Sequence, residues 1–159
     1  MLSYASLNDA LEIKDELINN KYLFENNNKN KKKLKPNYLI YEFNDIRISV
    51  GKNNIQNDYL TNHFAKKNEW WFHVKDNTGS HVIVHTDLEL DEDLIRCAAN
   101  LAAYYSSARL SSSVKVDYTK VKYIKKVPGK KGSFVTYKNE KSIFIDPNID
   151  EINNLKVIK

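Results

Sequence analysis

Strict alternation of apolar and polar residues marks the middle of this chain and predicts the strands of a half-buried sheet. Residues 38–43 and 46–50 alternate in this way. Asn44 and Asp45 lie between them, and both residue types tolerate positive φ, so we expect a hairpin with a two-residue turn. Further strand-like segments follow at 70–75, 81–85, 114–118, 121–126, 133–137 and 142–146.

Helical spacing of apolar residues occurs in three other segments. Residues 6–24 predict a helix that Ser6 can cap and that ends in the polar Lys/Asn-rich stretch 25–36. A second helix is expected after Asn53, with Gln56 as the reciprocal capping partner. Its predicted apolar face comprises Ile55, Tyr59, Leu60 and Phe64.

The third helix, over 91–108, has clear signals at both ends. Asp91 can cap its amino terminus, and Arg109 carries the charge that favours a helix carboxyl terminus. Its predicted buried stripe comprises Leu94, Cys97, Ala98, Leu101, Tyr105 and Ala108. Because strands come in hairpins and helices interrupt them only twice, we predict an α+β fold with a mainly antiparallel sheet and two packed helices.

The same patterns divide the chain into three regions. We expect residues 1–24 to form an N-terminal helical appendage, 25–36 a linker, and 37–159 one compact domain. The lone Cys97 excludes an internal disulfide and a thiolate-rich metal site. No apolar run approaches the length of a membrane span and the N-terminus lacks the features of a signal peptide, so we expect a cytoplasmic protein with no membrane partner.

Positive charge is concentrated in two segments of the chain, which points to a function for the predicted fold. The formal net charge is +5, but residues 29–35 carry five lysines and no acid. Residues 114–141 carry nine lysines against only Asp117 and Glu140. Two such segments indicate a surface that faces a polyanion, whereas the alternative is a solvated lysine-rich surface. Aromatic residues interleave the second segment, which a merely solvated surface would not need.

Chemistry-bearing side chains gather on one predicted sheet face. Side chains alternate along strands, so a hairpin that pairs Lys75 with His81 would place six residues together. These are Trp71, His73, Lys75, His81, Ile83 and His85. A register slip of one residue would move a strand's side chains to the opposite face.

Three interpretations of this face remain open, beside the possibility that its residues are merely structural. Three histidines could hold zinc, although no carboxylate on these strands offers a general base and Lys75 disfavours a cation. His73 and His81 could act as acid and base in a phosphodiesterase. Alternatively, Trp71 is a stacking platform beside imidazole and ammonium donors for RNA.

A second feature is the loop at 125–132, which reads Lys-Lys-Val-Pro-Gly-Lys-Lys-Gly. Its glycines permit close backbone approach and its lysines supply positive charge. The loop lacks the spacing of a P-loop and no predicted helix follows it, so nucleoside triphosphate binding is not indicated. We interpret it as a loop that contacts a phosphate backbone.

Taken together, several short motifs resemble a known family over roughly residues 37–147. They are GKNNIQNDYLT at 51–61, WFHVKD at 71–76, GSHV at 79–82, AAYYSSAR at 102–109, VDYT at 116–119 and VTY at 135–137. Their succession resembles the NFACT-R domain that ends ribosome quality-control proteins of the RqcH/NEMF type, whose bacterial members are often labelled fibronectin-binding protein A. Thr78 and Lys131 stand where the family pattern has proline.

The resemblance implies RNA binding without catalysis, and no metal or cofactor. Family members bind obstructed large ribosomal subunits and recruit tRNA, so that untemplated C-terminal tails, of alanine in bacteria, are added. The helix at 6–24 is similar to the end of the family's coiled-coil arm. The NFACT-N domain, the helix-hairpin-helix region and most of that arm are absent from this sequence, so we expect a fragment or a stand-alone domain.

We therefore predict a module that binds tRNA and large-subunit ribosomal RNA, with ribosomal proteins as further candidate partners. The predicted phosphate contacts are Lys120, Lys122, Lys125, Lys126, Lys130 and Lys131. Trp71, His73, Lys75 and His81 would form a more specific pocket, and the wider set adds Lys52, Asn53, Asn54, Asp76, Ser80 and Arg109. The alternatives are a histidine-dependent nuclease or metal hydrolase, and a protein-interaction module of the adhesin, fibronectin-binding type.

Overall fold

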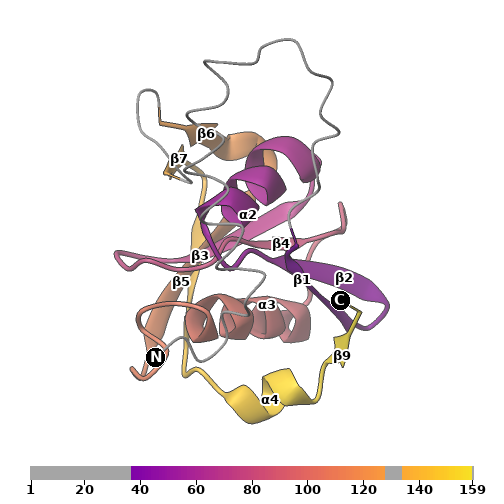
Figure 1. Ribbon diagram of the computed structural model, residues 1–159, viewed down its shortest axis with the longest axis vertical. Helices are drawn as coiled ribbons and strands as arrows, with labels where there is room; N and C mark the ends of the chain where they lie inside the picture. Colours follow the sequence, from indigo (N-terminus) through magenta and orange to yellow (C-terminus); the bar gives the residue numbers. More distant parts are fainter. Residues whose placement is uncertain (1–36, 128–133, 159) are drawn as a thin grey trace, which may run out of the picture.

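The computed structural model describes residues 37–127 and 134–158. Within them runs a seven-stranded sheet of order β8-β5-β3-β4-β2-β1-β9, in which every pairing is antiparallel (Figure 1). Its strands are β1 (Leu39–Phe43), β2 (Ile46–Val50), β3 (Trp70–Val74), β4 (Val82–Val84), β5 (Val114–Lys120), β8 (Lys141–Ile145) and β9 (Lys156–Val157). A second, two-stranded sheet comprises β6 (Ile124–Lys126) and β7 (Val135–Tyr137).

Short helices accompany these sheets. They are α2 (Asn54–Asp58), the π-helical segment η1 (Tyr59–Phe64), α3 (Glu92–Tyr104), the 3₁₀ turn η2 (Val121–Tyr123) and α4 (Ile149–Asn153). The predicted α+β class with a mainly antiparallel sheet is confirmed. The predicted β1–β2 hairpin is also confirmed, because Asn44 and Asp45 adopt φ of 49° and 64° and form a two-residue turn.

Helix α3 covers one face of the large sheet (Figure 1). Asp91 caps it as predicted, since its Oδ1 accepts a hydrogen bond of 2.8 Å from the Leu94 backbone N–H. The alanines of α3 are fully buried against apolar strand residues such as Phe72 and Val82. Small side chains let the helix approach the sheet closely, and this layer forms the main hydrophobic core.

The end of α3 differs from the prediction. The helix stops at Tyr104 rather than at residue 108, and no basic residue lies in its last turn. Tyr105 and Ala108 are still buried, but in the turn that follows, and Cys97 is only partly buried. The guanidinium of Arg109 lies 5.3 Å from the centre of the Tyr104 ring instead of capping the helix.

The opposite face of the sheet is covered by α2, η1 and the β6–β7 sheet. Leu60, Trp71, Ile83 and Val121 are the buried residues of this second core. The expected apolar face of the helix after Asn53 is largely wrong, because Leu60 alone of its four members is fully buried and Phe64 remains 43% exposed.

Polar residues take the buried positions instead. Gln56, Asn57 and Thr61 are buried, and their spacing with Leu60 is helical. The Gln56 side chain accepts from the Lys52 N–H at 2.7 Å and donates to the Asn37 carbonyl at 2.7 Å. Burying an amide is tolerated when its hydrogen bonds are made, and this one holds the chain on both sides of the β1–β2 hairpin.

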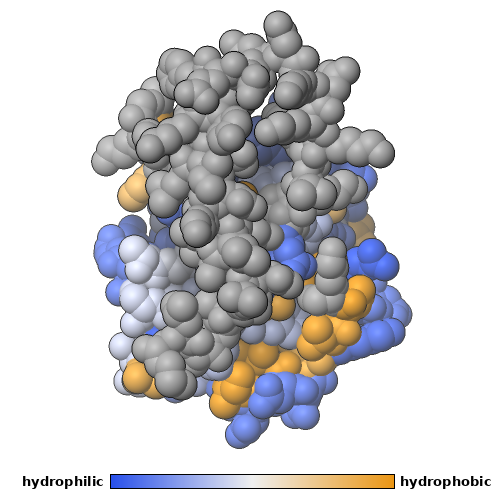
Figure 2. All heavy atoms as spheres, in the orientation of Figure 1, coloured by the Kyte–Doolittle hydropathy of each residue, from blue (hydrophilic) through white to orange (hydrophobic). Residues whose placement is uncertain are grey.

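Two elements at the end of the chain were not predicted. Asn148 caps the single turn α4, and Asn100 of α3 binds the Asn148 backbone at both its carbonyl and its N–H. Strand β9 adds to the edge of β1. Figure 2 shows hydrophobic residues gathered around α4 and β9, where Ile149 and Val157 are exposed. Elements this short carry too few residues to show a period in the sequence.

Several predictions fall outside the described residues. They concern the helix at 6–24, the linker at 25–36 and the loop lysines Lys130 and Lys131. In the part of the chain that the structure describes, no helix is long and apolar enough to cross a membrane.

Candidate nucleic-acid interface

Strands β3 and β4 pair as predicted in direction but not in register. Trp71 lies opposite Ile83 and Phe72 opposite Val82, which directs His73 toward His81. The expected pair of Lys75 with His81 is therefore wrong by two residues. A slip of two preserves the side on which each side chain lies, so the predicted common face of these strands survives.

Cross-strand neighbours on this face form three rows across β5 and β3, and the middle and outer rows begin on β8. The inner row is Thr119 and Trp71, with Ile83 on β4. The middle row is Ser142, Asp117 and His73. The outer row is Phe144 and Lys115, with Lys75 just beyond the end of β3, whose backbone N–H donates to the Lys115 carbonyl at 2.9 Å.

Trp71 is not the open stacking platform that we expected, because its side chain is only 1% exposed. The His73 ring stacks parallel to the indole at 5.6 Å, and the Tyr137 ring of β7 lies 4.8 Å away. A base cannot reach the indole without displacing one of them. The indole Nε1 is buried and has no hydrogen-bond partner among the described residues.

The two central histidines are neutral at pH 7. His81 is 3% exposed, and its Nδ1 shares a 2.7 Å hydrogen bond with Thr61 Oγ1. Burial, with a smaller contribution from His73, lowers the pKa of His81 to about 3. Burial also lowers the pKa of His73, and backbone groups of Val74 and Gly79 with the charge of Asp117 oppose that shift. Neither imidazole therefore supplies positive charge to a phosphate.

His85 does not join His73 and His81, because its ring is hydrogen-bonded to other residues. Its Nε2 lies 2.6 Å from Ser49 Oγ, and its Nδ1 lies 3.1 Å from a Glu69 carboxylate oxygen. Over residues 37–127 and 134–158, no group of three or more His, Cys, Asp or Glu side chains is placed to hold a metal ion. The three-histidine zinc site considered from the sequence is therefore not assembled.

Asp117 is a buried anchor whose role the sequence analysis missed. Its carboxylate accepts hydrogen bonds from Tyr137 Oη at 2.7 Å and Ser142 Oγ at 2.6 Å, and Lys75 Nζ lies 3.9 Å away. Burial, then the hydrogen bond to Asp117, raises the pKa of Tyr137. The sequence carried one signal of this role, because Asp117 is the single acid in a strand that otherwise carries lysines. The anchor ties β7 and β8 to β5 and so holds Tyr137 over Trp71.

Five predicted site residues meet at a separate polar pocket of about 550 Å³. Lys52, Asn53, Asn54, Ser80 and Arg109 line this pocket, together with Asn57, Thr78, Gly79, Tyr105, Ser106, Ser107 and Leu110. The pocket lies where the β2–α2 turn, the loop before β4 and the turn after α3 converge. Lys52 and Arg109 supply its positive charge, and most of the other lining residues carry a hydroxyl or amide group.

Backbone pairing shapes the wall of the polar pocket. Gly79 and Ser106 form an isolated antiparallel bridge, and the Ser80 N–H donates to the Tyr105 carbonyl at 2.9 Å. A Cβ on Gly79 would lie 2.8 Å from the Ser106 Cβ, which is closer than packed carbon atoms approach. Glycine is therefore required here for close packing of the two segments.

Asn57 connects the polar pocket to the histidines. Its Oδ1 accepts a hydrogen bond from the His81 backbone N–H at 3.0 Å. Gly51 packs closely against Asn57, because a Cβ on Gly51 would lie 2.9 Å from the Asn57 backbone nitrogen. Asn53 caps α2 as predicted, accepting from the Gln56 N–H at 3.0 Å. Asn57 was not among the predicted site residues, although its helical spacing with Leu60 indicated an inward-facing side chain.

Four of the predicted phosphate-contacting lysines lie in the described part of the chain, and Lys120 lies on the other side of the sheet from β6. Lys126 Nζ lies 3.0 Å from Asp58 and so ties β6 to α2, and Lys122 lies over Tyr123. Lys120 pairs with Trp70 and lies over its ring, on the α3 side of the sheet. Lys125 is exposed on β6, opposite Thr136. Asp76 is exposed in the turn after β3, with a φ of 57°.

The described residues thus form an antiparallel sheet in which basic and amide side chains converge on a pocket near the ends of β2 and β4. Comparison with known proteins is more specific: the model of the NFACT protein RNA binding domain matches residues 35–138. The chain belongs to this family.

Two curated relatives support the assignment. The chain is 45% identical to the Rqc2 homolog RqcH of Bacillus subtilis over 98% of its own length and 28% of the relative's. It is 42% identical to the Rqc2 homolog RqcH of Streptococcus suis over 99% of its length and 29% of the relative's. The chain thus spans less than a third of the curated relatives that it matches.

A solved structure shares the fold. It is described as the structure of the C-terminal of the fibronectin/fibrinogen-binding protein from Streptococcus suis. The TM-score is 0.81 at 42% identity, and the match covers 98% of this chain and 63% of the other.

Proposed function

We propose that this chain is the RNA-binding part of a ribosome quality-control factor and that it binds RNA at the polar pocket. The observation that carries the proposal is the convergence of five residues, chosen from sequence alone, on one pocket within a chain of the NFACT RNA-binding family. The ligands proposed are tRNA and the RNA of the large ribosomal subunit, with ribosomal proteins as additional contacts.

Charge and hydrogen-bonding capacity support the polar pocket as the place of contact. Lys52 and Arg109 come from segments far apart in the sequence, and phosphate is the group that such a pair of cations recognises. Asparagine amides and serine hydroxyls beside them can bind sugar or base edges. The exposed Lys125 extends the positive surface along β6.

The role of this chain in the whole protein is to hold RNA rather than to transform it. His73 and His81 are neutral and packed among other side chains, which does not favour them as an acid–base pair. The relatives are named Rqc2 homolog RqcH, and by extension this chain would help to recruit tRNA for C-terminal alanine tailing on stalled ribosomes in the cytoplasm.

Fluorescence anisotropy of labelled tRNA across a salt series tests the proposal, with double-stranded DNA of matched length as a control. We expect affinity to fall on the order of tenfold to a thousandfold from low to moderate salt, because each neutralised phosphate releases counterions. The double variant Lys52→Ala/Arg109→Ala should lower the salt slope by about two.

Lys156→Ala is the matched control, since this exposed lysine lies on β9 beside Glu42 and does not line the polar pocket. Its affinity and salt slope should equal those of the unmodified chain. Equal binding of tRNA and DNA, or a double variant that behaves like Lys156→Ala, would overturn the proposal.

The Streptococcus suis neighbour suggests a second candidate function, because its description names fibronectin and fibrinogen binding. Immobilised fibronectin, probed with this chain and with the double variant, separates the two functions. Saturable binding that the double variant retains would indicate a protein-binding surface outside the polar pocket.

A further inference from the structure

We infer that Phe144 stacks an unpaired RNA base and that Lys115, next to it, holds the phosphate of that nucleotide. The inference rests on the proposed RNA-binding function and adds a second contact site, outside the polar pocket. It also assigns the stacking role to a residue other than Trp71.

The three rows of this sheet face differ in what covers them. Trp71 of the inner row and Asp117 of the middle row are fully buried, and Tyr137 from β7 contacts both. Phe144 of the outer row is 64% exposed. The cover formed by β6, β7 and η1 thus leaves Phe144 open to solvent, while Lys115 and Lys75 beside it are partly exposed.

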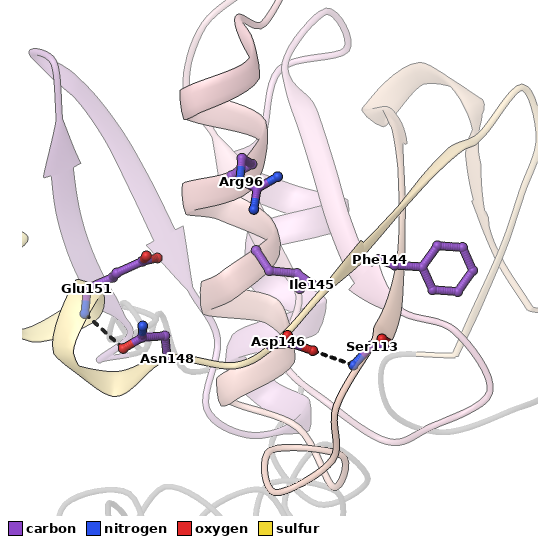
Figure 3. A pocket seen from close by; sticks show the side chains of 7 residues that line it. All are labelled: Arg96, Ser113, Phe144, Ile145, Asp146, Asn148 and Glu151. Carbon is purple, nitrogen blue, oxygen red and sulfur yellow. Dashed lines mark hydrogen bonds between the residues drawn. The ribbon is translucent and has the colours of Figure 1, made fainter.

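Among the described residues, Phe144 belongs to neither of the two hydrophobic cores. Neighbouring Ile143 and Ile145 pack into the main core, whereas Phe144 projects from the other side of β8. In Figure 3 its ring points away from α3, while Ile145 points toward α3. Figure 3 draws the residues that line a smaller pocket, in which Phe144 and Ile145 lie near Arg96, Asp146 and Glu151. The volume of this pocket is about 270 Å³.

Positive charge lies directly beside the exposed ring. Lys115 is the cross-strand neighbour of Phe144, and such neighbours have Cβ atoms about 5 Å apart. The structure records no acidic partner for Lys115 among the residues it describes. Lys75 completes the row, with its ammonium 3.9 Å from the buried Asp117.

An aromatic ring on an open sheet face beside a lysine matches the chemistry of an unpaired nucleotide. The base has a π-face for the ring, and its phosphate lies within reach of a neighbouring ammonium. A duplex hides its bases in the stack, so the outer row should distinguish single strands from duplexes. Stacking is also tolerant of sequence, which predicts little preference among bases.

The experiment uses the full chain and a short unstructured RNA that carries 2-aminopurine, whose fluorescence is quenched when the base stacks. Phe144→Ala should weaken single-strand binding about tenfold and abolish the quenching, because stacking on one aromatic ring is worth that much. Phe144→Trp should retain both signals. Phe144→Leu, which keeps an apolar side chain, should lose the quenching.

Lys115→Ala should lower the salt slope by about one without abolishing the quenching. Leu88→Ala is the matched control, because this apolar side chain is comparably exposed at 69% but lies outside the three rows. It should leave affinity and quenching unchanged.

The outcomes separate this inference from the function on which it rests. Salt-dependent tRNA binding that is lost in Lys52→Ala/Arg109→Ala, together with an inert Phe144→Ala, would overturn the stacking site alone. Quenching retained in Phe144→Leu would overturn it as well, since an apolar contact would then suffice. Absence of any RNA binding by the chain would overturn both proposals.

Discussion

The two faces of the large sheet bury their residues in different ways. The face under α3 buries mainly apolar side chains, with Phe72, Val82 and alanines of α3 fully buried. The opposite face buries His81, Asp117 and Thr119 around a single indole. Apolar burial is non-directional and stabilises in proportion to area, whereas buried polar groups must each be hydrogen-bonded.

The second face sets the positions of neighbouring elements more than it sets stability. Three of its buried polar side chains are each joined to another element: Asp117 to β7 and β8, His81 to η1, and Asn57 to the loop before β4. These directional contacts align the polar pocket with the sheet.

The largest effect is expected on the α3 face. Phe72→Ala should lower the free energy of unfolding by about 3–5 kcal/mol, because it leaves a cavity in a fully buried position. Urea denaturation measures the change. Phe144→Ala is the control from the open row and should change stability by less than about 0.5 kcal/mol. Similar losses of stability in Phe72→Ala and Phe144→Ala would contradict the difference in burial between these two positions.

Removal of the Asp117 anchor should have the next largest effect. Asp117→Ala leaves the hydroxyls of Tyr137 and Ser142 without their acceptor, and we expect a loss of about 2–3 kcal/mol in urea denaturation. Tyr137→Phe removes one donor and keeps the ring, so its loss should be smaller, about 1 kcal/mol. Solvent exposure of Trp71, followed by its fluorescence, should increase in Asp117→Ala only.

The neutral histidines make stability depend on pH. In the unfolded chain His81 binds a proton below about pH 6.5, whereas in the folded protein its pKa is about 3. The unfolded state therefore binds more protons in this window, and stability falls as the pH falls. Between pH 6.5 and 5 the contribution of His81 is about 2 kcal/mol.

His81→Asn tests this contribution, because an amide can replace the imidazole near Thr61 without titrating. Urea denaturation at pH 6.5 and 5 should show a loss of stability smaller by about 2 kcal/mol than in the unmodified chain. If His81→Asn and the unmodified chain lost equal stability between pH 6.5 and 5, His81 would have to be protonated in the folded state at pH 5. No titrating histidine lies under α3 to produce a similar effect in the core residues described.

The smallest effect concerns the ion pair between β6 and α2. Lys126→Ala should cost at most about 1 kcal/mol, because both partners are partly exposed to solvent and salt. Tenfold higher salt should reduce even this difference. A larger loss would indicate that the cover over Trp71 depends on this pair rather than on Asp117.

Much of this fold could be predicted from local signals in the sequence. Asn44 and Asp45 specified their turn, Asp91 and Asn53 specified the starts of their helices, and alternation specified which side chains share a face of β3 and β4. Each signal is local, since caps, turns and alternation depend on residues within a few positions of one another. The five residues of the polar pocket were found as single candidates.

Only the tertiary structure decided how those residues combine. The register of β3 against β4, the position of Tyr137 over Trp71 and the separation of Lys120 from the other lysines arise from pairings between distant segments. Alternation says which residues share a face but not what covers that face. The chain therefore specified by itself the strands, the caps and the chemistry available, while packing decided that Trp71 is buried and Phe144 is open.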